Sequence, residues 1–470
     1  MNLTRNLHRA IPALLAGGAL WLNAAAAAHA ADLYVSAKGS DTNNGKSAAT
    51  AFRTLKKAAA LVEPGDTVLV GDGEYTDAET GGGSAVLTLS RAGRPGAWIT
   101  WKAQPGQRPV IRPVGWQGIA VRTSYQVLDG LTVLGNNDSI TLIDALKDAT
   151  PAKDGKLPPP NPRFNTNGII VEGRQNAPDA KPHHVVIRNC TVSKCAGGGI
   201  AAIEADYVTV EDCRIFENAW YSRYGCSGFT TLDNWAFDDA PGYHIIVQRN
   251  YVWNNKGLVP WGKIGKLSDG NGIILDVTDQ ARQGANNPTG DAATAPSATA
   301  PAPAAPAKPK RPEWKGRALI ANNVSAFNGG SGIHTFRTRY VDIVNNTTYW
   351  NGQVVNYEEI FANNSQDVNI MNNVIVPRPG GRVTSNNRNT NVRWDYNLYP
   401  AAQTVMTGPH DIVAEPRFVG ITSDPTSGGF QLVKNSPGVG SGSLELPLPT
   451  NILNRPRSAA RNGGRNRGAY

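Results

Sequence analysis

A two-part motif returns along most of this chain and limits what it can fold into. Each copy has a short run of alternating apolar residues that ends in Asn or Asp, and in most copies a Gly-Ile step accompanies it. The first part occurs at Val186–Cys190, Val208–Cys213, Ile246–Asn250, Ile320–Val324, Ile343–Thr347 and Ile370–Val374, and the second at Gly168-Ile169, Gly199-Ile200, Gly228-Phe229, Gly272-Ile273 and Gly332-Ile333. Units this small cannot bury an apolar face alone, so they must stack. Short period-two runs separated by Asn and Gly turns predict a β-solenoid.

The spacing of the copies indicates the kind of solenoid. Asn189 and Asp212 are 23 residues apart, as are Asn322 and Asn345. A coil of about 23 residues contains three short strands and three turns, which is typical of a right-handed parallel β-helix. Asn side chains at one corner of successive coils can hydrogen-bond along the axis. We therefore interpret the Asn corners as structural.

The N-terminus predicts export. Arg5 and Arg9 precede an apolar run from Ile11 to Leu22, and an Ala-rich tract ends in Ala28-His29-Ala30. This pattern is typical of a signal peptide over residues 1–30, and a single membrane anchor is the alternative. We expect a secreted or periplasmic monomer with no membrane span after cleavage.

The charge favours an anionic partner. The net charge of +9 falls to +7 without Arg5 and Arg9, which suits an anionic polysaccharide. We expect no nucleic-acid partner, and no phosphate-binding Gly loop, zinc spacing or serine triad motif occurs.

The mature chain is predicted to be one β-helix domain over residues 31–450. An Ala/Pro-rich stretch at about 281–313 is expected to be a disordered insertion, with a cell-wall tether as the alternative. Residues 451–470 are expected to form a solvated basic tail. Cys190 and Cys213 hold the same position in successive coils, but four cysteines, with Cys195 and Cys226, allow three pairings, which stay open.

Both ends of the mature chain contain motifs of a known family. They are Tyr34-Val35-Ser36, Gly39-Ser40-Asp41, Phe52-Arg53-Thr54, Pro64-Gly65-Asp66-Thr67-Val68, Ser436-Pro437-Gly438 and Gly468-Ala469-Tyr470. In these motifs the chain resembles secreted right-handed parallel β-helix proteins, including the pectate lyase family 9 group. The resemblance implies an all-β parallel β-helix, and the short helix from Lys56 to Val62 is expected to cap its open end. The Asp269-Gly270-Asn271 segment matches that group's Asp-Gly-Phe strand in part and lacks its Lys.

A second row of residues emerges when the coils are aligned at the Gly-Ile step. Each strand then ends in a charged residue, and the row contains Glu172, Glu204, Asp233, Asp276 and Arg337. Parallel stacking predicts that these side chains form one line along the axis. Carboxylates at this spacing repel one another unless a cation lies between them, and calcium accepts several carboxylate oxygens. We expect calcium at Glu204, Asp233, Asp276 and Asp269.

This arrangement suits β-elimination from a uronic-acid polymer, as the resemblance also implies. A cation would neutralise the substrate carboxylate while a base removes the neighbouring proton. Arg337 is the first candidate for that base, followed by Lys266, Lys263 and His334, and a surface ion pair is the alternative for each.

Two long turns precede the Gly-Ile strands at residues 217–226 and 254–271. They contain the expected substrate-binding residues Trp220, Tyr221, Arg223, Tyr224, Trp261 and Lys263. The alternative is that Trp220 and Trp261 only fix their loops to the solenoid.

We therefore expect an exported enzyme that cleaves an acidic polysaccharide by calcium-assisted elimination. Two alternatives are a β-helical glycoside hydrolase that uses two acids such as Asp233 and Asp276, and a non-catalytic polysaccharide-binding solenoid.

Overall fold

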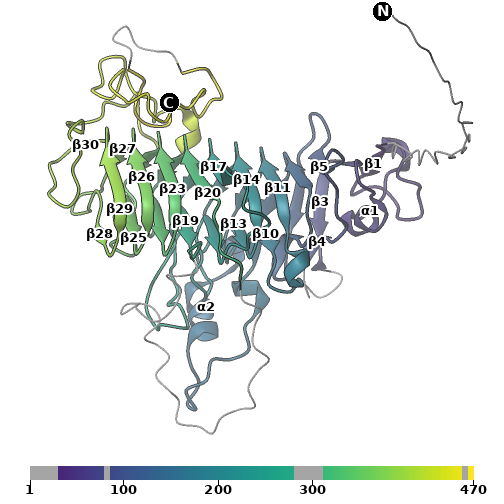
Figure 1. The fold of residues 1–470 in the computed structure, drawn as a ribbon. Coiled ribbons are helices and arrows are strands. Elements are labelled where there is room, and N and C mark those ends of the chain that lie inside the picture. The colour runs from purple at the N-terminus through teal and green to yellow at the C-terminus, as the bar shows by residue number, and fades with distance from the viewer. Residues whose placement is uncertain (1–29, 79–84, 280–310, 458–463) are drawn as a thin grey trace, which may run out of the picture.

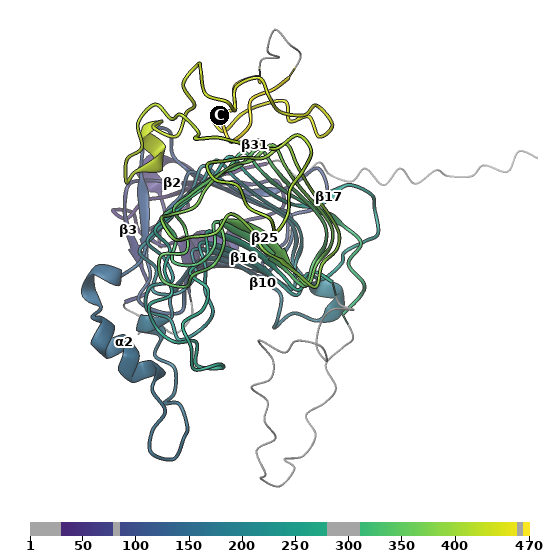
Figure 2. The same cartoon turned by 90° about the vertical axis from the view of Figure 1, so that its left-hand side faces the viewer.

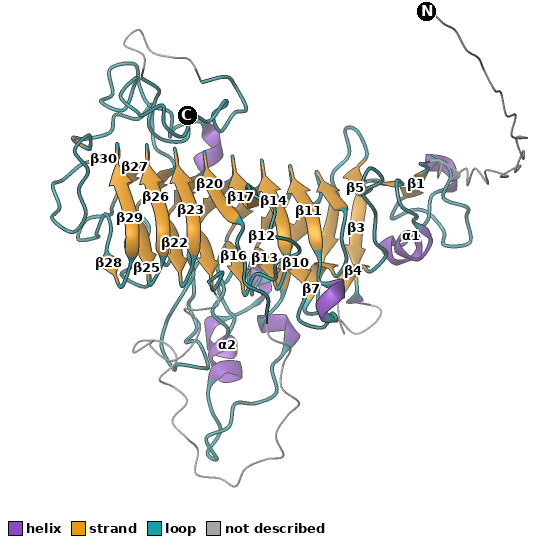
Figure 3. Ribbon diagram, viewed as in Figure 1, coloured by secondary structure: helices purple, strands orange, loops and turns teal. Residues whose placement is uncertain are grey.

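The chain winds into a solenoid with three strands in each coil (Figures 1 and 3). The computed structural model describes residues 30–78, 85–279, 311–457 and 464–470. Three parallel sheets, named A, B and C here, run along the axis and contain 11, 11 and nine strands within those residues. The expected signal peptide and almost all of the Ala/Pro-rich stretch lie outside the described residues.

Sheet A supplies the second strand of most coils. Its strands are β1 (Asp32–Val35), β2 (Thr67–Val70), β5 (Ile99–Ala103), β8 (Gln126–Asp129), β11 (His183–Arg188), β14 (Asp206–Glu211), β17 (Tyr243–Gln248), β20 (Arg317–Ala321), β23 (Arg339–Val344), β26 (Gln366–Met371) and β29 (Thr390–Asp395).

Sheet B follows sheet A in each coil. Its strands are β3 (Gly73–Thr76), β6 (Pro109–Arg112), β9 (Thr132–Leu134), β12 (Thr191–Ser193), β15 (Arg214–Phe216), β18 (Tyr251–Trp253), β21 (Val324–Ala326), β24 (Thr347–Tyr349), β27 (Val374–Val376), β30 (Leu398–Tyr399) and β31 (Ile412–Val413).

Sheet C contains the Gly-Ile steps. Its strands are β4 (Ala85–Leu89), β7 (Gln117–Val121), β10 (Asn167–Glu172), β13 (Ile200–Ile203), β16 (Phe229–Leu232), β19 (Ile273–Asp276), β22 (Ile333–Phe336), β25 (Ile360–Asn363) and β28 (Asn386–Asn387). The register aligns Ile169, Ile200, Phe229, Ile273, Ile333 and Ile360.

Few helices accompany the sheets. They are α1 (Leu55–Leu61), α2 (Leu142–Ala149) and the short 3₁₀ turns at Ala48–Thr50, Asn137–Ser139, Pro162–Phe164, Pro178–Ala180 and Pro425–Ser427. Helix α1 begins after Thr54, whose side chain accepts a hydrogen bond from the Lys57 amide, and it contacts β1 at the N-terminal end of the solenoid (Figure 1). No helix in the described parts of the chain is long and apolar enough to cross a membrane.

Side chains from all three sheets meet in one apolar core. Inward positions alternate along each strand, as Val185 and Ile187 do on β11, and they are fully buried. The alternation predicted from the sequence therefore sets which side of every sheet faces inward. The expected all-β right-handed parallel β-helix is confirmed.

The corner between sheets A and B contains the predicted Asn ladder. The ladder uses the second residue of each Asn pair: the backbone N and Nδ2 of Asn323 both donate to Oδ1 of Asn346, at 3.0 and 2.9 Å. Asn346 donates in the same way to Asn373. Cys190 and Cys213 occupy this inner position in earlier coils, and both are buried free thiols. The ladder holds successive coils in register.

The first residue of each Asn pair faces outward and binds the C-terminal segment. Nδ2 of Asn322, Asn345 and Asn372 donates to the backbone oxygens of Thr450, Asn466 and Ser443, respectively. This segment lies on the side of the solenoid opposite α2 (Figures 1 and 2).

The expectation of a solvated basic tail agrees with the exposed residues 453–456 but is wrong for residues 467–470, which are buried. Arg467 is 2 % exposed and donates to the backbone oxygens of Asn397, His410 and Ser441, and burial lowers its pKa to about 10. Arg457 donates to the backbone oxygen of Gly468 and is also largely buried by the segment. These arginines satisfy carbonyl groups that the irregular segment leaves without partners.

Candidate functional site

Sheet C is the face from which the longest connections project. Figure 2 looks along the solenoid, and α2 with the neighbouring loops extends beyond sheet C on one side. Helix α2 packs through Ala145 against Phe164 and Val259, so these connections share a small apolar core of their own. One edge of sheet C therefore has a built wall of loops.

The outer face of sheet C is mostly apolar. One row of outward side chains aligns in register and contains Ala120, Ile170, Ala201, Thr230, Ile274, His334 and Phe361. Ala120, Ile170 and Ile203 form a hydrophobic cluster separate from the main core. Most of this row is covered, since Ala120, Ile170, Ile274, Phe361 and His334 are each 6 % exposed or less.

The predicted charged row divides into two rows. The register places Glu172 opposite Ile203, and Asp276 opposite Leu232 and Phe336. Glu204, Asp233 and Arg337 come one residue later, at the corner, where their φ angles are 49°, 52° and 53°. The single line expected from the sequence is therefore wrong, because Glu172 and Asp276 lie three residues after the aligned apolar residue and the others lie four.

Each acid of these two rows has a basic neighbour. Glu172 pairs with Arg174 at 2.5 Å and Glu204 pairs with Lys181 at 2.5 Å. Asp233 lies 3.8 Å from Arg311, and Asp276 lies 3.9 Å from Arg337. Guanidinium and ammonium groups thus balance the carboxylates that calcium was expected to bind.

The described residues do not fit a calcium centre. They contain no cluster of three or more Asp, Glu, His or Cys side chains arranged to hold a metal ion. Asp269, the fourth expected ligand, stands at the opposite edge of sheet C from Asp276, with strand β19 between them. A calcium ion needs six to eight oxygens at about 2.4 Å, and these carboxylates are not grouped to supply them.

Asp269 differs from the other acids because no basic side chain pairs with it within the described residues. Its carboxylate accepts hydrogen bonds from the Ser268 hydroxyl at 2.7 Å and from Asn271 Nδ2 at 3.3 Å. A Cβ at Gly225 would lie 2.6 Å from Oδ2 of Asp269, so glycine lets the neighbouring loop approach this carboxyl. Desolvation raises the pKa of Asp269 above the ordinary Asp value.

His334 is a poor general base in this structure. It is 6 % exposed, and burial lowers its pKa to about 3. Its ring stacks on Phe361 with centroids 4.6 Å apart, and Nδ1 lies 2.6 Å from the Ser331 hydroxyl. A neutral imidazole of such low basicity fits a packing role on the outer face.

Arg337 lies at the corner after β22. Its guanidinium carbon is 4.4 Å from the centroid of the Phe336 ring, and its Nη2 contacts Asp276. These contacts suit a charge partner better than a general base.

The first long turn contains several residues that the sequence assigned to the substrate. Trp220 donates from Nε1 to the Asn254 backbone oxygen, and Tyr221 packs on the loop core. Arg223 is 6 % exposed and donates to the backbone oxygens of Asp148 and Pro158. These contacts support the alternative that such residues fix the loops in place.

The remaining turn residues are accessible. Tyr224 is 45 % exposed, and Trp261 begins a tight turn in which its amide donates to the Lys266 backbone oxygen. The Lys263 ammonium lies 5.7 Å from the Trp261 ring, and both Lys263 and Lys266 are exposed. Gly262 donates to the backbone oxygen of Arg223, so the two long turns are adjacent.

Sequence reasoning did not identify Tyr357. Burial raises its pKa, and the charge of Asp269 adds to that effect, which places the two groups near each other. Tyr357 lies in the connection before β25 and is edge-on to His334, with centroids 6.2 Å apart. No repeat position pointed to it, because it precedes the Gly-Ile register by several residues.

Comparison with known proteins agrees with the fold. The family described as "Right handed beta helix region" matches residues 161–280. The chain folds as a right-handed parallel β-helix. A comparison with curated protein sequences finds no match.

Solved structures with a similar fold include carbohydrate enzymes. Pectate lyase Pel9A has 16 % identity and a TM-score of 0.49, with 93 % of this chain and 96 % of that chain covered. The GH136 lacto-N-biosidase from Eubacterium ramulus has 16 % identity and a TM-score of 0.45, with 82 % and 67 % covered. XylC in complex with xylose has 11 % identity and a TM-score of 0.46, with 93 % and 98 % covered.

Proposed function

We propose that this protein is an exported enzyme that cleaves a polysaccharide bound beside the loops at the edge of sheet C. The observation that carries the proposal is the carboxyl group of Asp269, which lies in the second long turn against Gly225 of the first. Asp269 is desolvated, has a raised pKa and has no basic partner among the described residues, whereas Asp276 ends β19 beside Arg337. A desolvated carboxyl group of raised pKa is typical of a general acid.

Hydrolysis of a glycosidic bond assigns the role of general acid to Asp269. Protonated Asp269 donates its proton to the glycosidic oxygen as the bond to the anomeric carbon breaks. Water attacks the anomeric carbon and releases its proton to the solvent, because Asp276 lies beyond β19, which alone spans about 10 Å, and the two carboxyl groups of a glycosidase are roughly 5–9.5 Å apart. Ser268 and Asn271 orient Asp269, and the exposed Tyr224 offers a ring for a sugar to stack on.

One single substitution tests this assignment. Asp269→Asn should lower kcat at least about 100-fold, because general acid–base catalysis contributes roughly 100- to 10,000-fold. Asp239→Asn is the matched control, since Asp239 is 61 % exposed and pairs with Lys315. Release of reducing ends from a panel of neutral and acidic polysaccharides measures the activity.

The outcomes separate the possibilities. If the wild type releases no reducing ends from the whole panel, or if Asp269→Asn retains its activity, the hydrolase proposal is wrong. Retained binding without cleavage would instead favour a non-catalytic polysaccharide-binding solenoid.

β-Elimination from an anionic polysaccharide is the second candidate. The row of basic groups at the corner between sheets C and A, from Arg174 to Arg337, supports it because these groups can meet substrate carboxylates. Arg337→Ala should then abolish formation of the unsaturated product that absorbs near 235 nm, while polymer binding persists. Since the acids do not form a calcium site, chelation should leave either activity unchanged.

A further inference from the structure

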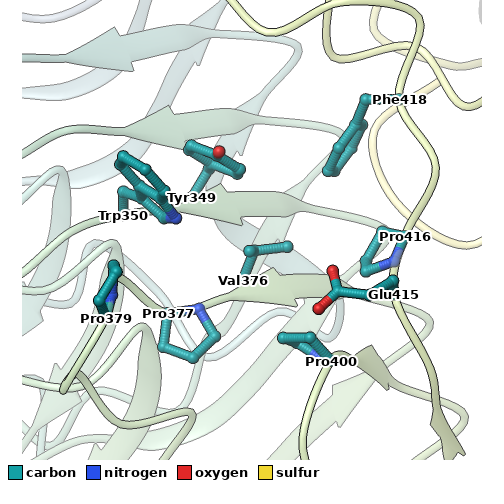
Figure 4. A pocket seen from close by; sticks show the side chains of 9 residues that line it. All are labelled: Tyr349, Trp350, Val376, Pro377, Pro379, Pro400, Glu415, Pro416 and Phe418. Carbon is teal, nitrogen blue, oxygen red and sulfur yellow. The ribbon is translucent and has the colours of Figure 1, made fainter.

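A cavity lies on sheet B, on a different side of the solenoid from the sheet C face (Figure 4). Its volume is about 330 Å³. The ends of strands β24 and β27 form one side, and the C-terminal segment after β31 forms the other. The lining residues are Tyr349, Trp350, Val376, Pro377, Pro379, Pro400, Glu415, Pro416 and Phe418.

Aromatic rings build the first wall of this cavity. The Tyr349 and Trp350 rings stack with centroids 5.1 Å apart and planes inclined by 16°. Phe418 and Phe430 both meet Tyr349 edge-on, and Phe430 is 1 % exposed. Trp350 remains 39 % exposed, so a rigidly supported indole faces the solvent.

The other lining groups are prolines and one carboxylate. Four proline rings add flat C–H surface without any hydrogen-bond donor. Glu415 stands opposite the aromatic wall in Figure 4. Burial of Tyr349 raises the pKa of that residue, and the charge of Glu415 raises it further. No Lys, Arg or His belongs to the lining.

This combination selects among ligands by chemistry. A flat aromatic wall packs against the C–H face of a pyranose ring, and a carboxylate accepts hydrogen bonds from vicinal hydroxyl groups. A uronic acid or phosphate would meet Glu415 with no Lys, Arg or His among the lining residues, which disfavours anionic ligands. Arg378 and Arg417 are next to lining residues in the sequence, and Arg378 is held by the Gly352 backbone oxygen and Asn356. The volume is at the lower end of the range for small-ligand sites and holds one or two sugar rings.

We propose that this cavity is a non-catalytic binding site for an uncharged saccharide. It is separate from the sheet C face, so it would hold a polymer while another part of that polymer is processed, or anchor the protein to a neutral polysaccharide. Trp350 provides the stacking surface and Glu415 the hydroxyl acceptor.

Calorimetric titration of the full chain with cellohexaose tests the site. Trp350→Ala should weaken binding at least tenfold, and Glu415→Gln should weaken it a fewfold because an amide oxygen is a poorer acceptor. Phe237→Ala is the matched control, since Phe237 is an exposed aromatic residue at the corner between sheets C and A. This variant should bind cellohexaose as tightly as the wild type does. Unchanged melting temperatures show that the variants fold.

A second ligand checks the selectivity. A galacturonate hexamer should not compete for the site in the wild type, and Glu415→Lys should gain affinity for it. The inference is overturned if cellohexaose does not bind at millimolar concentration, if Trp350→Ala binds equally well, or if the galacturonate hexamer competes. Binding that is lost in Asp269→Asn or Asp276→Asn but not in Trp350→Ala would instead place cellohexaose on the sheet C face.

Discussion

The corner between sheets A and B and the corner between sheets C and A are built from opposite materials. The first is lined by neutral amides that bond to one another, as Asn323, Asn346 and Asn373 do within the wall. The second is lined by acids, each held by a basic side chain from a loop, as Lys181 holds Glu204. An amide both donates and accepts, so identical amides satisfy one another from coil to coil, whereas identical acids repel and need another partner.

This difference explains why one corner repeats in sequence and the other varies. From Asn250 to Asn397 the amide corner repeats the same residue on successive coils, so this part can be recognised from the sequence alone, whereas Cys190 and Cys213 hold the position in earlier coils. The charged corner only requires that each acid meets a base, and the base can come from any nearby loop. Variable loops are also where binding and catalysis concentrate.

The largest expected effect comes from breaking the amide ladder. Asn346→Ala removes the two hydrogen bonds that Asn323 donates to Oδ1 of Asn346 and the two that Nδ2 of Asn346 donates to the Ile320 backbone oxygen and to Asn373, and it leaves buried polar groups without partners. Each orphaned group costs about 1–3 kcal/mol, so we expect a loss of about 3 kcal/mol or more in the free energy of unfolding. Denaturant unfolding measures it.

The outer neighbour Asn345 is the control for this experiment. Asn345→Ala loses contacts with the C-terminal segment and should cost about 1 kcal/mol. Equal losses at both positions would contradict the division into inner ladder and outer docking residues.

The C-terminal segment covers the amide corner, and removing its buried arginine should uncover it. Arg467→Ala leaves the backbone oxygens of Asn397, His410 and Ser441 without that donor, so we expect a loss of about 2 kcal/mol. Faster hydrogen exchange at Asn345 and Asn372 would accompany it. A variant as stable as the wild type would show that the segment is held by other contacts.

The corner between sheets B and C contains both an amide ladder and a buried acid, so its contribution to stability depends on pH. A second ladder runs through Asn255, Asn328 and Asn351 and ends on Glu359, which accepts from the N and Nδ2 of Asn351 at 2.7 and 2.6 Å. Burial raises the pKa of Glu359 to about 8. Between pH 5 and 8 the folded chain keeps a proton that the unfolded chain has released, so stability should fall as pH rises.

Glu359→Gln should remove this pH dependence, because the amide has no proton to lose, although its single oxygen replaces only one of the two carboxylate oxygens that accept from Asn351. We expect the melting temperature of the variant to rise relative to that of the wild type between pH 5 and pH 8. A thermal scan across that range tests it, and parallel curves for the two proteins would contradict the raised pKa.

The smallest effect is expected at the charged corner. Asp233 is 27 % exposed and 3.8 Å from Arg311, so Asp233→Asn should cost about 1 kcal/mol or less, and still less at high salt. It should also leave cleavage unchanged, because the proposed general acid is Asp269. A large loss of activity would instead favour the alternative in which Asp233 is one of the two acids.

The sequence predicted the repeated parts of the molecule well. The Gly-Ile register and the Asn corner follow from residues that recur at one spacing, and the structure confirms both. The charged row was misjudged because the alignment ignored whether an acid lies three or four residues after the aligned apolar residue. A difference of one residue changes the direction of a side chain in a strand.

The sequence by itself determined the coil: its length, its inward residues and its amide ladder, because these repeat and each copy reports on the same local geometry. Only the tertiary structure decided how single groups are used. Arg223 and Arg467 are buried donors to backbone oxygens, and Asp269 is a carboxyl with no basic partner among the described residues. Burial and partners at such positions depend on loops from distant parts of the chain, and no repeat encodes them.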